Sequence, residues 1–402
     1  MLLNSTFDSK LKPLSFLKFQ ADTIFTGVEA LSSNHVLVCD KKGKIIDIVD
    51  EQIAGDDIQM HTGIISPGLI NCHCHLELSH LKNIIPEQTG LVDFVLNIIQ
   101  KRNAKDETIQ QAIEEAEAEM IENGIVAVGD ICNTTHTLQQ KLKNNLYYHN
   151  FIEISGFVPS KANERFGEGM KLYHSFHQNF LNQTSLVPHA AYSVSENLFK
   201  LIDEQSSNQI LSIHNQESEA ENDFFINKSG DFLRLYQQLG IDLSFFHPTK
   251  QNSLAFALPY LNRADKVLLV HDVFTSKNDL ELIKNYSLKS KTQFYLCCCV
   301  LANRYISNSI PVDYIFQNNL DNIVIGTDSL ASNHSLNILS EIKSIKQAYP
   351  LLSEFKLLQC ATYNGAVALN IEHQFGSLQK GKQPGIILIE NLKTCTKPKK
   401  LV

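Results

Sequence analysis

The chain has 402 residues and a formal net charge of −8, with 43% hydrophobic and 19% charged residues. This composition is typical of a globular protein with a sizeable core, and no apolar run approaches the roughly 18 residues of a membrane span. Because the net charge is negative and no basic block interrupts it, neither nucleic acid nor an anionic membrane is expected as the main partner, and a small-molecule substrate is favoured.

The N-terminus and the cysteines indicate the compartment. The first 20 residues lack the basic start and apolar core of a secretion signal. Nine cysteines are an odd number, and three of them are consecutive at 297–299, so a disulfide framework is not expected in a chain this long. We therefore expect a cytoplasmic protein with free thiols.

The N-terminal stretch of the chain predicts a small β domain. Strand-like runs at 23–30, 35–40 and 45–50 alternate with turns. From residue 64 the pattern changes to apolar strand-like runs separated by longer helical patterns, which is the alternation of βα units around a parallel sheet. We therefore place the N-terminal portion of the small domain at residues 1–63.

About eight strand-like runs follow, which is the number that closes a barrel. They span 63–73, 124–130, 146–154, 185–193, 209–215, 266–272, 292–298 and 322–328. Helical patterns lie between them, among others at 91–102, 107–124, 278–287 and 336–350. The prediction is an α/β fold with a (β/α)8 barrel at 64–372. Short strands and turns return at 375–392, so 373–402 should complete a small β-sandwich with the N-terminal portion.

Two histidines stand at the end of the first run. Side chains two residues apart on a strand point the same way, so His73 and His75 can face the barrel axis and share one ion. The alternative is two ordinary histidines at a strand end. Active sites of such barrels lie at the C-terminal ends of the strands, which favours the ion.

Two further strand ends carry metal-ligand side chains. His214 ends the run 209–214, and Asp328 ends a continuous apolar run. A carboxylate at the end of a strand buried on both faces needs a cation or strong hydrogen bonds. Three imidazoles and one carboxylate suit zinc or a similar divalent ion.

Other polar groups near these positions suggest acid–base chemistry. Glu217 lies three residues beyond His214 and is a candidate acid/base. His271 ends the run 266–271, where it either orients or deprotonates water or is a hydrogen-bonded core residue. Soft metal ligands at 297–299 are the alternative to buried thiols, which we prefer because consecutive residues alternate between faces of a strand.

Several motifs in this order resemble one enzyme superfamily. The segments are "SPGLINCHCHLELS", "PHAAYSVS", "HNQESE", "IGTDSLASN", and "ATYNGAVALNI" followed by "GSLQKGKQPGIILI". They resemble the amidohydrolase superfamily, in its chlorohydrolase and aminopurine-deaminase branch, over nearly the whole chain. The stretch "HLELSHLKNIIPEQTGLVDFVLNIIQKR" looks most like the aminofutalosine deaminase group of that branch.

The resemblance implies roles for the positions that match. Metal ligands would be His73, His75, His214 and Asp328, holding one divalent ion, Zn²⁺ first and Fe²⁺ or Mn²⁺ as alternatives. Glu217 would protonate a ring nitrogen, and His271 would assist the attacking water, whose proton Asp328 or His271 can accept. Substrate contacts would come from His189 and Ser332, for which a packing histidine and a capping serine are the alternatives. A homodimer is compatible with the family.

Two segments depart from the family pattern. Ala191 replaces a proline that relatives commonly have, and residues 297–305 replace a Cys-Pro segment. Both changes concern the expected pocket wall and leave the expected ligands intact. Glu77 and Glu153 could contact a substrate, but the predicted site does not include them, because acidic groups at strand ends are often solvated or capping.

The predicted reaction is hydrolytic deamination of an aminated heteroaromatic ring, an adenine-type base or nucleoside above all, with release of ammonia. Hydrolysis of another leaving group, or of a cyclic amidine, is the alternative within the same class. From a different class, the alternative is a catalytically silent zinc-binding scaffold, because a fold alone does not establish activity.

Overall fold

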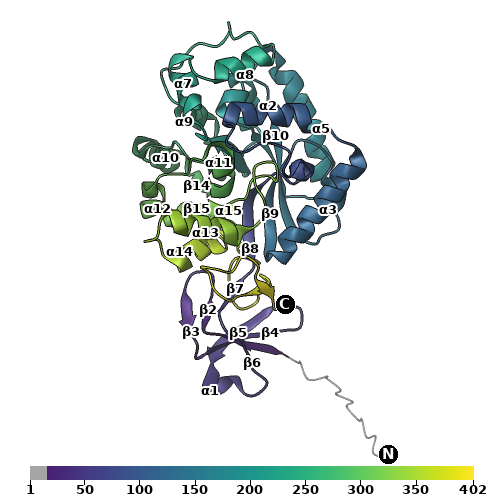
Figure 1. Cartoon of the computed structure of the whole chain (residues 1–402), viewed down its shortest axis with the longest axis vertical. Coiled ribbons are helices and arrows are strands. Elements are labelled where there is room, and N and C mark those ends of the chain that lie inside the picture. The colour runs from purple at the N-terminus through teal and green to yellow at the C-terminus, as the bar shows by residue number, and fades with distance from the viewer. Residues whose placement is uncertain (1–15) are drawn as a thin grey trace, which may run out of the picture.

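A computed structural model describes residues 16–402, except for the side chains of 318 and 319. The start of the predicted N-terminal segment of the small domain, and most of the stretch judged to lack a secretion signal, lie outside the described residues. Figure 1 shows a large α/β unit above a small β unit that holds the C-terminus. Among the described residues, no helix is long and apolar enough to cross a membrane.

The small unit is made of two sheets from both ends of the chain. One sheet has the order β5-β4-β1-β6 and the other β17-β16-β7-β2-β3. Their inner faces share a core that includes Phe19, Leu37, Ile65 and Ile386. The strands are β1 (Leu17–Gln20), β2 (Thr23–Phe25), β3 (Ala30–Ser32), β4 (His35–Cys39), β5 (Ile45–Asp50), β6 (Gln59–Met60), β7 (Ile64–Pro67), β16 (Ile386–Ile389) and β17 (Lys399–Lys400).

The large unit contains eight parallel strands, as the sequence predicts. They form two sheets, with the orders β11-β10-β9-β8 and β12-β13-β14-β15. Almost every residue in them is buried, which explains why they read as continuous apolar runs. Their bounds are β8 (Leu69–Cys74), β9 (Ile125–Cys132), β10 (Tyr147–Ile154), β11 (Thr184–Pro188), β12 (Ile210–Asn215), β13 (Lys266–His271), β14 (Gln293–Cys298) and β15 (Ile323–Ile325).

Two seams join these sheets into a closed ring. At the first seam Cys74 forms a parallel bridge with Asp328, and the Asp328 amide donates to the His73 carbonyl oxygen at 3.1 Å. At the second seam Ala190 forms a parallel bridge with His214, whose amide donates to the His189 carbonyl oxygen at 2.9 Å. The expected barrel is therefore present, and both seams lie at the C-terminal ends of the strands.

The expected first barrel strand is two strands in the structure. Residues 64–67 form β7, which pairs with β2 and β16 in the small unit, so the barrel strand β8 begins only at Leu69. Gly68 separates them, and its amide donates to the Pro384 carbonyl oxygen. A Cβ atom at this position would lie 2.3 Å from Val126 Cγ1. Any side chain would therefore clash there, which explains why a glycine connects the two units.

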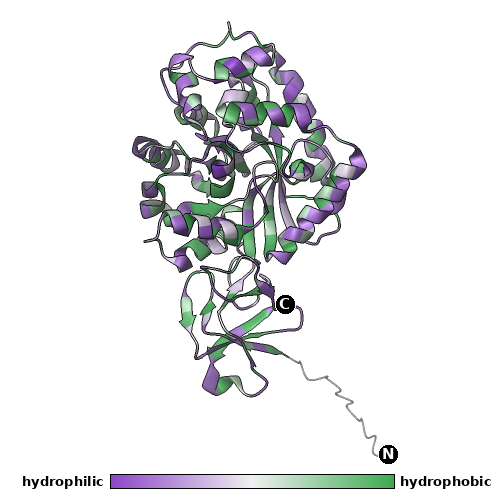
Figure 2. Ribbon diagram, in the orientation of Figure 1, coloured by the Kyte–Doolittle hydropathy of each residue, from purple (hydrophilic) through white to green (hydrophobic). Residues whose placement is uncertain are grey.

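Helices surround the barrel, and Figure 2 shows that they carry both hydrophilic and hydrophobic stripes, whereas the barrel strands are mainly hydrophobic. The helices are α1 (Glu51–Ala54) in the small unit and α2 (Leu91–Lys101), α3 (Asp106–Glu122), α4 (Leu138–Lys141), α5 (Ala162–His177), α6 (Glu196–Asp203), α7 (Glu219–Asn227), α8 (Phe232–Gln238), α9 (Ser253–Ala257), α10 (Lys277–Ser290), α11 (Val300–Ser307), α12 (Asp313–Asn319), α13 (Ile338–Ala348), α14 (Glu354–Cys360) and α15 (Tyr363–Ala368) around the barrel. Short 3-10 turns include η1 (Leu76–Leu81) and η3 (Ala191–Ser193).

Candidate metal centre

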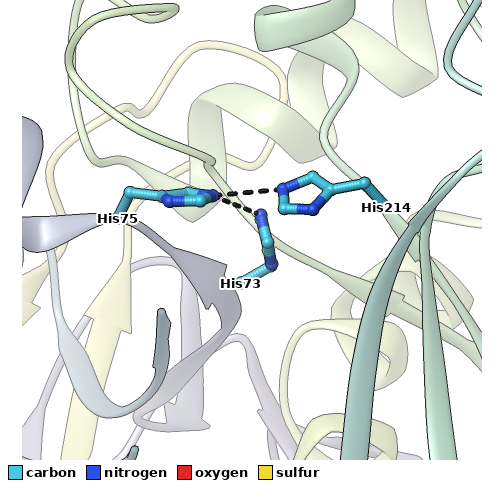
Figure 3. Close-up of side chains that lie close together, drawn as sticks. All are labelled: His73, His75 and His214. Carbon is cyan, nitrogen blue, oxygen red and sulfur yellow. Dashed lines mark hydrogen bonds between the residues drawn. The ribbon is translucent and has the colours of Figure 1, made fainter. Parts of the chain in front are cut away.

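Three histidine side chains converge at the C-terminal end of the barrel (Figure 3). His73 lies on β8, His75 directly follows it, and His214 lies on β12. The Nε2 atom of His75 is 3.1 Å from Nε2 of His73 and 3.2 Å from Nε2 of His214. The structure therefore brings three of the four predicted ligands together around one point, two from the sheet that contains β8 and one from the sheet that contains β12.

The fourth predicted ligand lies beside them. Asp328 Oδ1 is 3.4 Å from His75 Nε2 and 3.7 Å from His73 Nε2. The residue has a left-handed backbone, with φ of +57°, which aspartate tolerates better than most residues. Its second oxygen, Oδ2, accepts a hydrogen bond from the Ser332 hydroxyl at 2.6 Å.

The three imidazoles fit a divalent ion. Two nitrogens that bind one zinc ion at about 2.0–2.1 Å lie roughly 3.0–3.4 Å apart, and the observed separations fall in that range. Burial lowers the pKa of His73 well below its ordinary value and, with the neighbouring His189, lowers the pKa of His214 to about 3. The rings of His73 and His214 are therefore neutral at neutral pH, which is the form that binds a metal.

A second contact orients His214. Its Nδ1 atom donates to the His189 carbonyl oxygen at 2.8 Å, so the lone pair of the neutral ring lies on Nε2 and faces the centre. The carboxylate of Glu153 lies on the same side, with Oε2 3.5 Å from His214 Nδ1. No sequence pattern indicated the first contact, because it joins a side chain to the backbone of the preceding strand.

Glu217 and His271, the predicted acid–base residues, lie next to each other. Glu217 Oε2 is 3.6 Å from His271 Nε2, and both side chains are buried. Burial, with the nearby carboxylates of Asp328 and Glu221, raises the pKa of Glu217 well above its ordinary value. Burial lowers the pKa of His271 to about 4. The raised pKa favours the protonated form of the Glu217 carboxyl group, and His271 is a neutral imidazole at neutral pH.

Local structure holds these two residues in place. The Glu217 amide donates to Glu221 Oε1 at 2.8 Å, within a capping box in which Ser218 caps α7. His271 accepts at Nδ1 a hydrogen bond from Asn303 Nδ2 at 3.0 Å. Asn303 belongs to α11, inside the segment 297–305 that departs from the family pattern, and no sequence motif indicated it.

A cavity of about 480 Å³ opens beside the centre, a size common for small-molecule sites. Its inner end is lined by His75, His189, His214, Glu217, His271 and Asp328. Apolar side chains of α2 and α8 form its outer wall, and Arg102, Lys161 and Arg165 contribute to its lining as well. A larger hollow of about 970 Å³ runs along α10 on the outside of the barrel and contains none of the predicted site residues.

The two predicted substrate contacts differ in their surroundings. His189 lines the cavity, and its Nδ1 lies 2.6 Å from the Ser193 hydroxyl. Ser332 is fully buried, is not among the residues that line the cavity, and holds the Asp328 carboxylate instead. Ala191, in one of the altered segments, is also buried and lies two residues after His189.

The acidic and sulfur-containing candidates also separate clearly. Glu153 lines the cavity, whereas both Glu77 oxygens accept hydrogen bonds from protein groups. All three cysteines at 297–299 are buried free thiols. Among the described residues, the groups that could hold an ion contain no cysteine, so the preference for buried thiols agrees with the structure.

Comparison with known proteins places this geometry in a family. Residues 64–401 match the amidohydrolase family model. An aminodeoxyfutalosine deaminase of Nitratiruptor sp. is 24% identical over 382 residues, which cover 90% of this chain and 88% of that protein. A 5-methylthioadenosine/S-adenosylhomocysteine deaminase of Teredinibacter turnerae is 26% identical over 347 residues, with coverage of 81% and 72%.

Solved structures share the fold. The aminofutalosine deaminase of Helicobacter pylori, in complex with methylthio-coformycin, superimposes with a TM-score of 0.78 at 22% identity, covering 93% of this chain and 92% of that one. An adenosine deaminase from Xanthomonas campestris with bound zinc has a TM-score of 0.70 at 18% identity, with coverage of 93% and 84%. On the family match over residues 64–401, the chain belongs to the amidohydrolase family of metal-dependent hydrolases.

Proposed function

We propose that the chain catalyses hydrolytic deamination of an adenine-type nucleoside, in which oxygen replaces the 6-amino group and ammonia is released. The observation that carries the proposal is the buried Glu217, whose pKa is raised by burial, next to three convergent imidazoles at the inner end of a cavity. A carboxyl group that keeps its proton at neutral pH is suited to protonate a ring nitrogen. The named relatives, which are deaminases of adenine nucleosides and their derivatives, support the same reaction.

The size of the cavity supports a substrate larger than a free base. About 480 Å³ is more than a purine ring needs, and the apolar outer wall is suited to a nonpolar substituent. This agrees with the aminofutalosine-type and methylthioadenosine-type substrates in the names of the relatives.

One divalent ion belongs to the proposal, with His73, His75, His214 and Asp328 as its ligands. Zinc suits this donor set, and Fe²⁺ and Mn²⁺ are the alternatives. When bound, the ion supplies Lewis acidity that makes water a nucleophile at neutral pH. Measuring the metal content of protein purified from cells would identify the ion that is loaded.

Each acid–base residue then has one task. Glu217 donates its proton to the ring nitrogen next to the aminated carbon, so the attack does not leave a negative charge on the ring. Asp328 accepts one proton of the attacking water and returns it to the departing amine, and the second water proton leaves the oxygen as the carbonyl forms and restores the Glu217 carboxyl group. Because Asn303 donates to His271 Nδ1, the hydrogen of the neutral His271 ring lies on Nε2, from which it orients the water.

The test is to incubate the zinc-loaded protein with each of four compounds, aminodeoxyfutalosine, adenosine, S-adenosylhomocysteine and guanine, and to measure the release of ammonia. We expect release from at least one adenine nucleoside, and a fall of about 10² to 10⁴ in turnover for Glu217→Gln with unchanged metal content. Near-wild-type turnover of this variant would refute the assigned role. Absence of ammonia with one bound metal per chain would favour another leaving group or the silent scaffold.

The proposal includes a cytoplasmic location, a small-molecule substrate without nucleic acid, and a homodimer. The composition supports the first two, and the resemblance to the family is compatible with the third. Light scattering coupled to size-exclusion chromatography tests the dimer, because a 45.3 kDa chain gives clearly different masses for one and two copies.

A further inference from the structure

Glu153 is a buried carboxylate that faces the substrate cavity and has no role in the reaction described above. It lies near the end of β10, its side chain is 5% exposed, and it lines the cavity together with His189 and His214. A carboxylate removed from water in this way is costly unless hydrogen-bond donors surround it. The question is which donors these are.

One oxygen of Glu153 is held by the protein. Asn133 Nδ2 donates to Oε1 at 2.9 Å and also to the Glu153 carbonyl oxygen at 3.3 Å. The backbone amide of Asn133 donates to Glu77 Oε2 at 3.1 Å, and the Arg102 guanidinium donates to Glu77 Oε1 at 3.1 Å. These contacts fix the position of the Glu153 carboxylate relative to the cavity.

The other oxygen retains capacity to accept hydrogen bonds. Glu153 Oε2 lies 3.5 Å from His214 Nδ1, which is longer than a normal hydrogen bond. The hydrogen on that nitrogen already goes to the His189 carbonyl oxygen at 2.8 Å. Oε2 can therefore accept from a molecule in the cavity without breaking a protein contact.

Glu77 shows what a purely structural carboxylate looks like nearby. It is more deeply buried than Glu153, its Oε1 accepts from Arg102, and its Oε2 accepts from the backbone amides of Asn133 and Thr134 and from the Thr134 hydroxyl. Both of its oxygens are occupied by protein donors. Glu153 differs in that it lines the cavity and its Oε2 retains acceptor sites.

The chemistry of the surroundings selects the kind of donor. The His214 ring lies between Glu153 and the proposed ion, with Nδ1 towards Glu153 and Nε2 towards the centre. A cationic substrate group bound at Glu153 would therefore be repelled by a divalent ion only one imidazole ring away. Arg102, Lys161 and Arg165 also line the cavity. Neutral hydroxyl groups are therefore the donors that fit, and a carboxylate accepts well from a pair of them.

We propose that Glu153 binds the hydroxyl groups of a sugar attached to the aminated ring, so that the substrate is a nucleoside with a free diol and not a free base. This inference rests on the proposed deamination and names a residue and a substrate feature beyond it. Glu153 is then a specificity-determining residue, which touches the sugar while the base lies at the metal centre.

The test measures binding, so that it does not depend on turnover. Adenosine and 2′,3′-dideoxyadenosine are titrated by calorimetry into the zinc-loaded full chain carrying Glu217→Gln, with and without Glu153→Gln. The glutamine keeps an acceptor for Asn133 and replaces Oε2 by a donor. With Glu153 present, we expect adenosine to bind about 10- to 150-fold more tightly than the dideoxy compound, and we expect Glu153→Gln to bring this ratio to within about threefold of one.

Controls separate binding from folding. Glu107→Gln, an exposed position on α3 that does not line the cavity, should leave the ratio unchanged. Metal content and circular dichroism check that each variant is folded. If Glu153→Gln does not fold, Glu153→Asp, which withdraws the carboxylate by one methylene, should reduce the ratio instead.

Three outcomes would overturn the inference: a ratio near one with Glu153 present, a ratio that survives its replacement, or no binding of adenosine. Ammonia release by the wild-type chain reports separately on the proposed function. If ammonia is absent while the ratio depends on Glu153, the deamination is refuted and the role of Glu153 stands.

Discussion

Two glutamates show how the surroundings of a residue decide its protonation. Glu217 lines the cavity, whereas Glu341 on α13 does not line it and is fully buried, with its oxygens accepting from the Leu301 amide and from Asn333 Nδ2. Burial raises the pKa of Glu341 to about 8 in spite of these donors. The pKa of a side chain that is almost always ionised on the surface is therefore raised at both positions, and Glu341 is mainly neutral at pH 7.

The shifted pKa of Glu341 makes stability depend on pH. The unfolded chain releases this proton near the ordinary pKa of 4.5, while the folded chain keeps it until about pH 8. Since the folded state holds the proton longer, the contribution is complete below pH 4.5 and is lost as pH rises to 8. Between pH 5.5 and 8 we expect the free energy of unfolding to fall by about 3 kcal/mol from this group.

Urea unfolding of wild type and Glu341→Gln at the two pH values measures this contribution. The variant should lose most of that fall, because glutamine does not titrate. The exposed Glu281→Gln on α10 should keep the wild-type difference between the two pH values. Equal pH dependence of wild type and Glu341→Gln would show that Glu341 ionises normally.

At the scale of elements, a buried ion pair connects α4 to the barrel wall. Lys141 is completely buried, with Nζ 2.5 Å from Asp130 Oδ2 and within hydrogen-bonding distance of Asn150 Oδ1 at 2.9 Å. The other oxygen of Asp130 accepts from the Leu76 amide at 2.9 Å, directly after His75. The pair therefore joins α4, β9 and the turn that follows the first two proposed ligands.

Breaking this pair should cost more than breaking a surface pair. Lys141→Met leaves the Asp130 charge buried without its partner, and we expect a loss of about 3–5 kcal/mol in the free energy of unfolding. The matched control is Lys143→Met, whose partner Glu114 is exposed, with an expected loss below about 1 kcal/mol. Similar losses for the two variants, measured by urea unfolding, would contradict this assignment.

The strands and helices were largely predictable from the sequence, whereas the side chains that hydrogen-bond the site residues were not. Buried parallel strands read as continuous apolar runs ended by polar residues, so all eight could be recognised, and the polar ends indicated His73, His214 and Asp328. The division of the first run at Gly68 was missed, because β7 and β8 are equally apolar although they belong to different sheets. Asn133 and Asn303 were invisible, since an amide in a loop or a short helix follows no periodic pattern.

At the scale of the whole molecule, the proposed ligands join the two barrel sheets. His73 and His75 come from the sheet that starts with β8, while His214 and Asp328 come from the sheet formed by β12–β15. An ion that binds only the folded chain stabilises it, by about 4 kcal/mol at a free concentration 1,000 times its dissociation constant. Metal binding should therefore stabilise the barrel as a whole.

Removal of the metal tests this coupling. A chelator should lower the melting temperature of the wild-type chain by roughly 5 °C. The variant His214→Ala should melt near the chelated wild type and respond little to chelator. If the metal leaves, as measured by elemental analysis, and the melting temperature does not change, the ion does not hold the two sheets together.

The division of the ligands between the sheets also has a consequence for synthesis in the cell. A ribosome delivers β8–β11 first, and with them only two of the four proposed ligands. His214 follows with β12, and Asp328 emerges only after β15, more than 250 residues behind His73. A nascent chain therefore cannot assemble the full ligand set, and tight metal loading has to wait until nearly the entire polypeptide has been made.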